Sequence, residues 1–176
     1  MRKVILFIAM SLDGYIADNN GNVDWLLGHG NDSENIDIYS EFIQGVDTIL
    51  MGWNTYHQIT TDLSPTEWIY ADLTTYVITH HKMNNSEHIY FTDEAPAALL
   101  DRLKSTDGKN IWICSGANLV QQLMCDDLID QYHISVIPTI LGSGVQLFNN
   151  SAKEIKLKLL KTATYNGITD LIYTCR

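Results

Sequence analysis

Short apolar runs alternate along the chain with segments whose apolar residues recur at helical spacing. A strand buried on both faces tolerates a nearly continuous apolar run, whereas an amphipathic helix repeats its apolar residues every three or four positions. The runs predict strands at residues 3–10, 48–51, 76–79, 89–91, 111–114 and 132–137. The periodic segments predict helices around residues 36–43, 96–103 and 119–124. This alternation is typical of an α/β fold with crossover helices.

The C-terminal segment has a different pattern. Residues 155–160 and 168–173 are two strand-like runs, and Asn166-Gly167 lies between them. Asn-Gly is a strong hairpin signal because both residues tolerate a positive φ. We therefore expect a mixed sheet, mostly parallel, with an antiparallel C-terminal edge.

Ligands of such sheets bind outside the carboxyl ends of the strands. The corresponding segments here are residues 10–14, 52–55, 79–82 and 115–116. Asp13, directly after the first strand, belongs to an Asp-Gly turn, and turn chemistry alone can explain it. Its carboxyl group could equally hydrogen-bond or protonate a ring nitrogen in an apolar cleft.

Two other segments have the form of a strand followed directly by a helix. At Gly52–Thr55 and Ser115–Ala117, free N–H groups and the helix dipole could hold a phosphate, although every crossover has such a junction. Trp25 and Trp53 fit either the core or the wall of a site for a flat heterocycle. His80-His81 does not predict a metal site, because adjacent side chains at a strand end point apart.

Composition and charge narrow the function classes. The 176 residues predict one domain, 1–176, and 45% apolar residues suffice for a core. The net charge of −10 disfavours nucleic acid and membrane surfaces as partners. Between Lys3 and Lys82 the chain has eleven acids and no Lys or Arg. An anion bound by this half would need N–H groups, hydroxyls, imidazoles or cations from the other half.

Three cysteines without C-x-x-C spacing fit reduced thiols, which predicts a cytoplasmic protein. The apolar start after Arg2-Lys3 resembles a short signal peptide, but a strand buried on both faces explains it better. No apolar stretch approaches the ~20 residues of a membrane span.

Several of these segments together resemble dihydrofolate-reductase-like proteins, and in particular the C-terminal reductase domain of riboflavin-biosynthesis enzymes. In order and spacing, the matching segments cover nearly the whole chain. They are Ser11-Leu12-Asp13-Gly14-Tyr15-Ile16-Ala17, Asp24-Trp25, Asp47 to Tyr56, Ile111 to Ala117, Leu128-Ile129-Asp130, and Pro138 to Phe148.

The resemblance implies a three-layer α/β/α fold, a homodimer, and hydride transfer from NADPH to a pteridine- or pyrimidine-like heterocycle. It assigns the cofactor phosphates to Gly52, Trp53, Asn54, Thr55, Ser115, Gly116 and Ala117, and the nicotinamide to Ala9 and Met10. Asp13 and Trp25 would border the substrate. Asp32 or Glu34 comes nearest to the acid that true dihydrofolate reductases carry on their first helix, and the proton source stays open.

The departures from the family pattern concern the cofactor. Where the family usually has Gly-Arg-x-Thr, this chain has Trp53, so the guanidinium that pairs with the 2′-phosphate of NADPH is lost. Charge-assisted hydrogen bonds are about twice as strong as neutral ones, so we expect a weakened preference for NADPH over NADH. The side chain of Thr79, His80 or Lys82 could partly replace the missing guanidinium as a partner of the 2′-phosphate. A second usual glycine is Ser115, and Gln131 replaces the usual acid after Asp130.

The sequence therefore leaves two main functional hypotheses and a weaker third one. One is an NAD(P)H-dependent reductase of a small heterocycle; the alternative is a noncatalytic homologue that keeps the fold and cleft but has lost productive cofactor binding. The riboflavin-pathway reductase itself is a third option, but its phosphorylated substrate would find few cations in the N-terminal half.

The segment from Pro138 to Phe148 is unusually apolar for a loop, with Ile140, Leu141, Val145, Leu147 and Phe148 following Ile137. It could form a two-fold interface or cover the subunit's own core.

Overall fold

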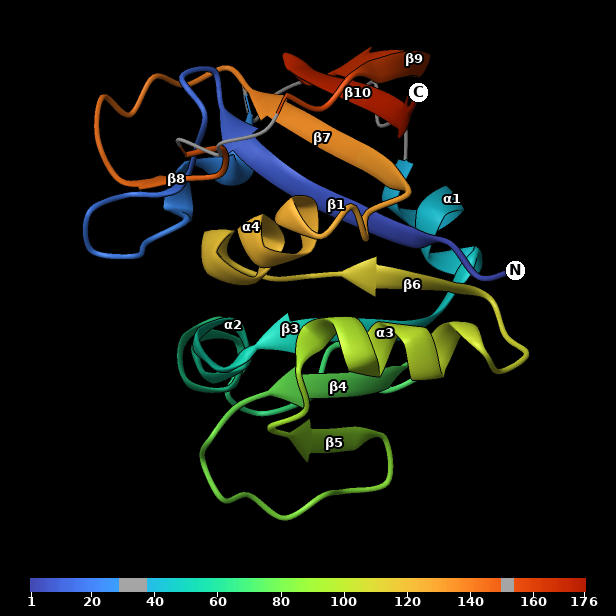
Figure 1. Cartoon of the computed structure of the whole chain (residues 1–176). Helices are drawn as coiled ribbons and strands as arrows, with labels where there is room; N and C mark the ends of the chain where they lie inside the picture. Colours follow the sequence, from blue (N-terminus) through green and yellow to red (C-terminus); the bar gives the residue numbers. More distant parts are fainter. Residues whose placement is uncertain (29–37, 150–153) are drawn as a thin grey trace.

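The structure of the protein is a computed structural model that describes residues 1–28, 38–149 and 154–176. Within these residues the chain forms an eight-stranded sheet (Figure 1). Its strands, in spatial order, are β5 (Ile89–Thr92), β4 (Thr74–Ile78), β3 (Val46–Gly52), β6 (Asn110–Ile113), β1 (Val4–Ser11), β7 (Gln131–Ile137), β10 (Ile168–Cys175) and β9 (Leu157–Tyr165). The first six are mutually parallel, and β10 runs antiparallel to both of its neighbours. The mixed, mostly parallel sheet with an antiparallel C-terminal hairpin is confirmed.

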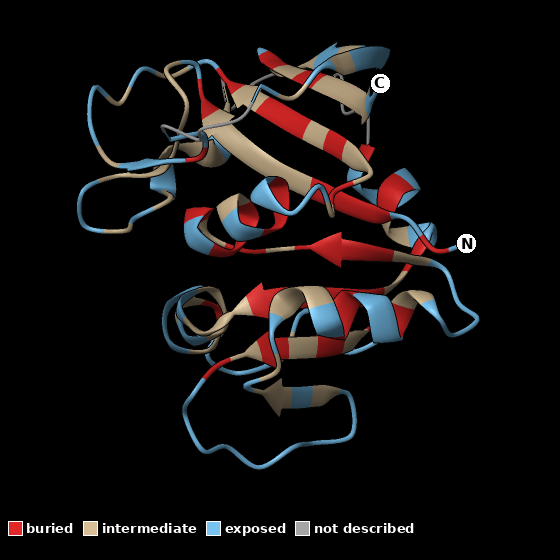
Figure 2. Ribbon diagram, in the orientation of Figure 1, coloured by how far each residue is buried: buried red, intermediate tan, exposed pale blue. Residues whose placement is uncertain are grey.

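Helices cover both faces of this sheet, as the layered α/β/α fold requires. One apolar core joins the sheet to α3 (Pro96–Lys104) and α4 (Ala117–Cys125). A second core, on the opposite face, joins it to α1 (Ile38–Gln44) and the short π-helical turn η2 (Ile59–Leu63). Residues of the inner strands are mostly buried (Figure 2), because each inner strand faces apolar side chains on both sides.

Strand β1 shows how the pattern of the sequence produces this layering. Val4 and Leu6 enter the core beneath α3 and α4, while Ile5 and Phe7 face α1. Successive side chains of a strand point to opposite faces, so an uninterrupted apolar run fills both cores. The strand is also hydrogen-bonded on both edges, to β6 and β7.

At the amino end of β1 a buried guanidinium joins three segments of the chain. Arg2 is 7% exposed and forms an ion pair with Asp47 at the start of β3. It also donates to the Thr48 hydroxyl at 2.6 Å and to the Lys109 carbonyl at 2.7 Å, next to β6. The Arg2 guanidinium also donates a hydrogen bond to the Leu103 carbonyl of α3, at 3.2 Å. The amino ends of β1, β3 and β6 are therefore fixed relative to one another.

Each predicted strand and helix has a counterpart in the described residues, with residues 36–37 of the first predicted helix outside them, but shorter elements were not anticipated. A small two-stranded sheet pairs β2 (Tyr15–Ala17) with β8 (Val145–Gln146), and η1 (Asp24–Leu27) is a 3-10 turn. The junction after β3 leads into the short helix α2 (Trp53–Gln58). These elements are too short for a hydrophobic period to reveal. Among the described residues, no helix has the length and hydrophobicity that a membrane crossing requires.

The apolar segment after β7 divides into buried and exposed side chains. Ile137 and Leu147 are 2% and 0% exposed in the subunit's own core, so for these two side chains the alternative that the segment covers the core holds. Ile140, Val145 and Phe148 are exposed. Leu141 is half-buried. A two-fold interface at this segment therefore stays a prediction for the side chains that are not buried.

Truncating Leu147 and Phe148 should affect stability very differently. Leu147→Ala leaves a cavity in the core and should lower the free energy of unfolding by about 2–5 kcal/mol. Phe148→Ala should change it by less than about 0.5 kcal/mol, as is usual for exposed sites. Urea unfolding of both variants tests this, and equal losses would contradict the burial described here.

We also expect Phe148→Glu to weaken self-association if the exposed apolar side chains form a two-fold contact. Sedimentation equilibrium should then give roughly twice the 19.9 kDa chain mass for the native protein and a lower mass for the variant. Leu159→Glu, an exposed leucine on the edge strand β9, is the matched control. A monomeric native protein would exclude this interface.

Candidate functional site

The predicted site segments meet where four parallel strands end. From β4 across to β1, the last strand residues are Ile78, Gly52, Ile113 and Ser11. The start of α2 and the start of α4 follow directly after β3 and β6, which are neighbours in the sheet. Two junctions that are 63 residues apart in sequence are thereby brought side by side.

These two junctions hold each other through reciprocal hydrogen bonds. The Gly52 N–H donates to the Ser115 hydroxyl at 3.0 Å, and the Gly116 N–H donates to the Thr55 hydroxyl at 3.1 Å. Ser115, which replaces a usual family glycine, is buried and so has a structural role here. A Cβ built on Gly116 would meet no described atom within 4 Å, which leaves open space over the start of α4. Neither helix start has a side-chain cap, so both suit an anionic ligand.

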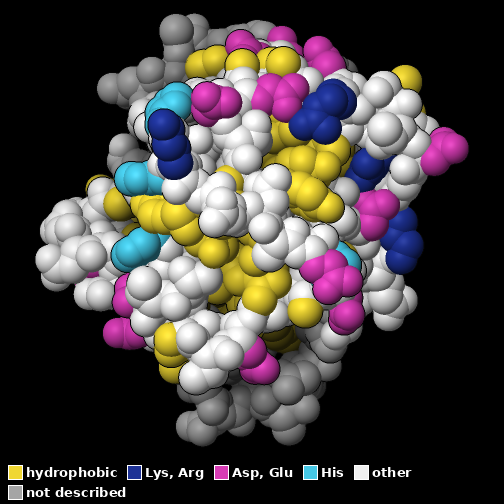
Figure 3. All heavy atoms as spheres, turned by 90° about the horizontal axis from the view of Figure 1, so that it is seen from below, with side chains coloured by type: hydrophobic (Ala, Val, Ile, Leu, Met, Phe, Trp, Pro, Cys, Tyr) yellow, Lys and Arg dark blue, Asp and Glu magenta, His cyan; other side chains and the backbone are white. Residues whose placement is uncertain are grey.

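Position 53 is occupied by an aromatic ring among imidazoles. The Trp53 ring lies 4.3 Å from the His81 ring and 5.6 Å from the His57 ring, measured between centroids. Thr79 is buried, and its hydroxyl accepts a hydrogen bond from the His81 N–H at 3.0 Å. His80 is exposed. Histidine side chains gather on one side of the face shown in Figure 3. Imidazoles thus stand near the place where the family pattern has a guanidinium.

Asp13 lies at the end of β1, and its carboxylate is fully engaged. It accepts hydrogen bonds from the Ser11 hydroxyl at 2.6 Å and from the N–H groups of Leu141 and Gly142 at 3.1 and 2.7 Å. These bonds, the one from Ser11 foremost, lower the pKa of the carboxyl below its usual value. The side chain is therefore held ionised as a tie between β1 and the segment after β7. A contact of Asp13 with substrate stays a prediction.

Trp25 is half-buried in η1, where its indole N–H donates to the Asn22 carbonyl at 3.3 Å. The end of this segment is fastened to the β9–β10 turn, because the Asn166 amide donates to the Leu27 carbonyl at 3.1 Å. The segment therefore lies against the turn of the hairpin. Asp32 and Glu34 lie outside the described residues.

Ala9 and Met10 present their side chains to opposite faces of the sheet. Met10 packs against the core beneath α3 and α4. Ala9 lies on the α1 face, directly opposite Ser135 of β7, which in turn lies opposite Asp170 of β10. The Ser135 hydroxyl is hydrogen-bonded to the buried Asp170 carboxyl group.

The sequence reasoning did not single out Ser135 or Asp170. The available signal was an acid inside the otherwise strand-like run 168–173, which is unusual because strands are depleted in Asp.

A pocket of about 730 Å³ adjoins the start of α4. It is lined mainly by neutral polar side chains, including Asn19, Asn118, Gln121 and Asn149, together with Ala117. Its position next to the open space at Gly116 extends the candidate site along α4.

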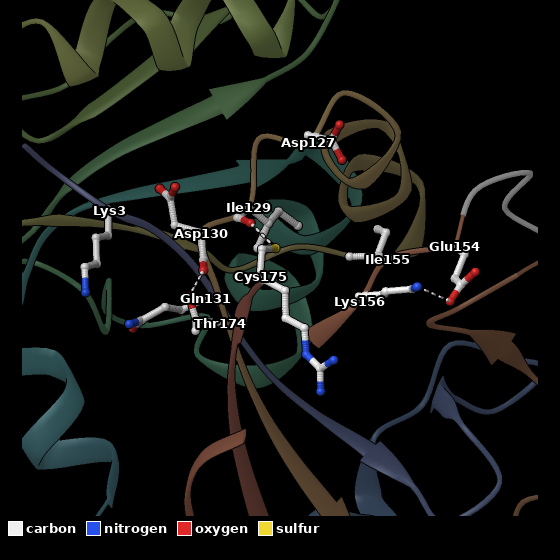
Figure 4. A pocket seen from close by; sticks show the side chains of 11 residues that line it. Lys3, Asp127, Ile129, Asp130, Gln131, Glu154, Ile155, Lys156, Thr174 and Cys175 are labelled. Carbon is white, nitrogen blue, oxygen red and sulfur yellow. Dashed lines mark hydrogen bonds and ion pairs between the residues drawn. The ribbon is translucent and has the colours of Figure 1, made fainter. Parts of the chain in front are cut away.

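A second pocket, of about 670 Å³, lies at the opposite end of the sheet (Figure 4). Its charges serve the fold: Asp130 accepts a bond from the Val4 N–H at 2.7 Å and pairs with Lys104 at 3.2 Å. Lys156 pairs with Glu154. The described residues contain no cluster of three or more potential metal ligands.

The contacts of Asp13 predict a specific effect on acid stability. A carboxylate whose pKa is lowered by folding stabilises the protein above its unfolded pKa, and the contribution is lost as the pH falls through the folded value. Asp13→Asn should therefore lower the melting temperature at pH 7 and reduce the difference between pH 7 and pH 3. Thermal melts across this range, with Asp93→Asn as an exposed control, test this; an unchanged melting curve would leave Asp13 without its structural role.

Comparison with known proteins agrees with this geometry. The Bacillus subtilis protein YwjB is 42% identical over 173 residues, which cover 98% of this chain and 97% of that protein. A protein of Shewanella sp. PV-4, described as a riboflavin biosynthesis protein, has a crystal structure that matches with a TM-score of 0.84 and 27% identity, over 99% of both chains.

A bifunctional deaminase/reductase of Thermotoga maritima shares the fold at a TM-score of 0.72 and 15% identity, over 57% of its longer chain. The model of the RibD C-terminal domain matches residues 2–169. The chain therefore belongs to the RibD C-terminal domain family.

Proposed function

We propose that the protein is an NAD(P)H-dependent reductase of a small pteridine- or pyrimidine-like heterocycle. The observation that carries this proposal is the pair of hydrogen-bonded strand-to-helix junctions at Gly52–Thr55 and Ser115–Ala117. Two uncapped helix starts beside an open space provide backbone N–H groups for a dinucleotide. Membership of the RibD C-terminal domain family, which is that of a reductase domain, supports the same activity.

The residues fit the pyrophosphate of such a cofactor better than the 2′-phosphate of NADPH. The two junctions would hold the pyrophosphate, and Ala9 and Met10 would lie beside the nicotinamide. When bound, the reduced nicotinamide would supply the hydride. The chain itself would orient the heterocycle against that ring and exclude water from it.

The substrate side is supported by the aromatic side chains of the α1 face. The Phe7 and Tyr39 rings stack with their centroids 6.2 Å apart, and Tyr39 is exposed. Such rings suit a flat heterocycle. The Thermotoga maritima relative is named for reducing a phosphoribosylamino-uracil, which supports a pyrimidine-like ring. The absence of Lys and Arg between Lys3 and Lys82 argues against a phosphorylated form of that substrate.

One observation favours the noncatalytic alternative. The Trp53 ring packs at 4.3 Å on His81, where a guanidinium would otherwise meet the 2′-phosphate. If this packing also blocks the adenosine end of the cofactor, neither nucleotide will bind. Calorimetric titration with NADPH and NADH separates the two proposals, because only the reductase binds at least one of them.

The identity of residue 53 should set the cofactor preference. We expect the native protein to bind NADPH and NADH with similar affinity, and Trp53→Arg to favour NADPH by roughly tenfold or more, because a hydrogen bond to a charged group contributes about 1.5–3 kcal/mol. Trp68→Arg, on the aromatic cluster beside Tyr56, is a control for adding a cation elsewhere. A strong native preference for NADPH that survives His80→Ala and Lys82→Ala would contradict this prediction.

A further inference from the structure

A polar pair interrupts the α1 face of the sheet at the level of the candidate site. Ala9, Ser135 and Asp170 occupy directly opposed positions on β1, β7 and β10, so all three point to the same face. This is the face of α1, since Phe7 and His133, two residues before Ala9 and Ser135, both pack on Phe42 of α1. Neighbouring strands lie about 4.8 Å apart. A ring placed beside Ala9 would therefore meet Ser135 first and Asp170 behind it.

Asp170 is unusually deeply buried for an acid. Its side chain is 2% exposed, and one carboxyl oxygen is hydrogen-bonded to the Ser135 hydroxyl. The other oxygen, Oδ2, is buried and has no donor in good hydrogen-bonding geometry among the described residues, although the Tyr165 hydroxyl interacts with this carboxyl group. Burial raises the pKa of this carboxyl above its usual value, and the hydroxyls of Ser135 and Tyr165 offset only part of that increase. Burial therefore favours the protonated form of Asp170 more than solvent exposure would.

A purely structural role does not account for this arrangement. An incompletely satisfied buried carboxyl destabilises a fold, and an apolar residue would complete the strand at lower cost in free energy. By contrast, Asp13 has three donors and a lowered pKa, which makes it a poor source of protons. Among the described acids, Asp170 combines burial, a raised pKa and a position two strands from Ala9.

We propose that Asp170 is the proton reservoir of the reduction and that Ser135 relays its proton to the heterocycle. The inference rests on the proposed reductase function. As the carbon of a C=N bond accepts hydride, its nitrogen forms an N–H bond with the proton of the Ser135 hydroxyl. The Ser135 oxygen takes the Asp170 proton in the same relay, which leaves a carboxylate that regains a proton from water. Asp170 does not contact the substrate and acts only through Ser135, so it is a positioning residue. Ser135 is the residue that contacts the substrate.

Other ionisable groups near this pair must be separated from Asp170 in any pH experiment. On the same face they are His133 of β7, Tyr165 and Lys161 of β9, and Tyr39 and Glu41 of α1, with Asp13 beyond the end of β1. Burial lowers the pKa of His133 to about 4, so its ring is neutral at higher pH. Lys161 pairs with Glu41 at 3.2 Å.

The first test measures the proton without using activity. Because folding raises the pKa of Asp170, its proton stabilises the native state at low pH, and this contribution is lost as the pH rises from about 3.8 through the folded value. The Asp170→Asn variant has no such proton to lose. Its free energy of unfolding should therefore increase relative to that of the native protein as the pH rises. Asp93→Asn, at an exposed acid, should show no such trend.

The second test compares turnover. First, NADPH and NADH binding and oxidation with a panel of pterins and pyrimidines establish the native activity; if no nucleotide binds or no heterocycle is reduced, the proposed function fails and this inference fails with it. With native turnover in hand, Asp170→Asn and Ser135→Ala should each lower kcat by about 10²–10⁴-fold with little change in KM or nucleotide affinity.

In addition, the native kcat should fall as the pH rises through the Asp170 titration. The His133→Phe variant should show the same decrease in kcat, whereas the Asp170→Asn variant should not. If Asp170→Asn retains both the native rate and the native pH profile, the relay is overturned while the reductase function stands. Loss of rate with an unchanged pH profile would likewise assign Asp170 to structure alone.

Discussion

The sheet depends on the pairing of one buried charge. The Arg2 guanidinium is buried, and an unpaired buried cation would be strongly destabilising. Its N–H groups must therefore meet acceptors. Asp47, Thr48, Lys109 and Leu103 supply these acceptors from β3, from the start of β6 and from α3. The planar, multiply bonded group therefore defines how the amino ends of three strands sit beside one another. The close fit extends to Gly108, where a Cβ would lie 2.6 Å from the Asp47 carboxylate.

Fixing the amino ends of the strands also fixes the relative positions of their carboxyl ends, because the strands themselves are rigid. Strand β1 is packed on both faces and hydrogen-bonded on both edges, so its last residues have little freedom. The junctions after β3 and β6 are then close enough for Ser115 and Thr55 to lock them together. The candidate site thus consists of backbone N–H groups and short side chains held by a rigid sheet, with few long cationic side chains. This arrangement agrees with the scarcity of Lys and Arg in the first half of the chain.

The fold was predictable from the sequence where the signal was local. Apolar runs located the strands, helical spacing located α1, α3 and α4, and Asn166-Gly167 located the hairpin, because each pattern reports on neighbours along the chain. The β2–β8 pair and the division of Ile137 to Phe148 into buried and exposed residues depend on partners more than 100 residues away. Such partners leave no period in the sequence.

The site residues show the same limit. The junctions at Gly52 and Ser115 could be named from family motifs, but their mutual hydrogen bonds could not. Asp13 was visible as a turn residue, whereas its bonds to the N–H groups of Leu141 and Gly142 cross 128 and 129 positions. Asp170 was visible as an acid in a strand-like run, but its partner Ser135 is set by the register between β7 and β10 and could not be predicted.

The place of β1 also has a consequence for how the chain assembles. Its two partners, β6 and β7, begin more than 100 residues later, so β1 is synthesised long before its ladder can form. Contacts of such separation slow folding, because a long loop must close before the pairing is gained. Until then an apolar strand with two open edges is exposed to other chains, which makes the nascent protein most prone to aggregation before residue 137 has been made. A chaperone that shields β1 would protect an apolar strand until β6 and β7 have been made.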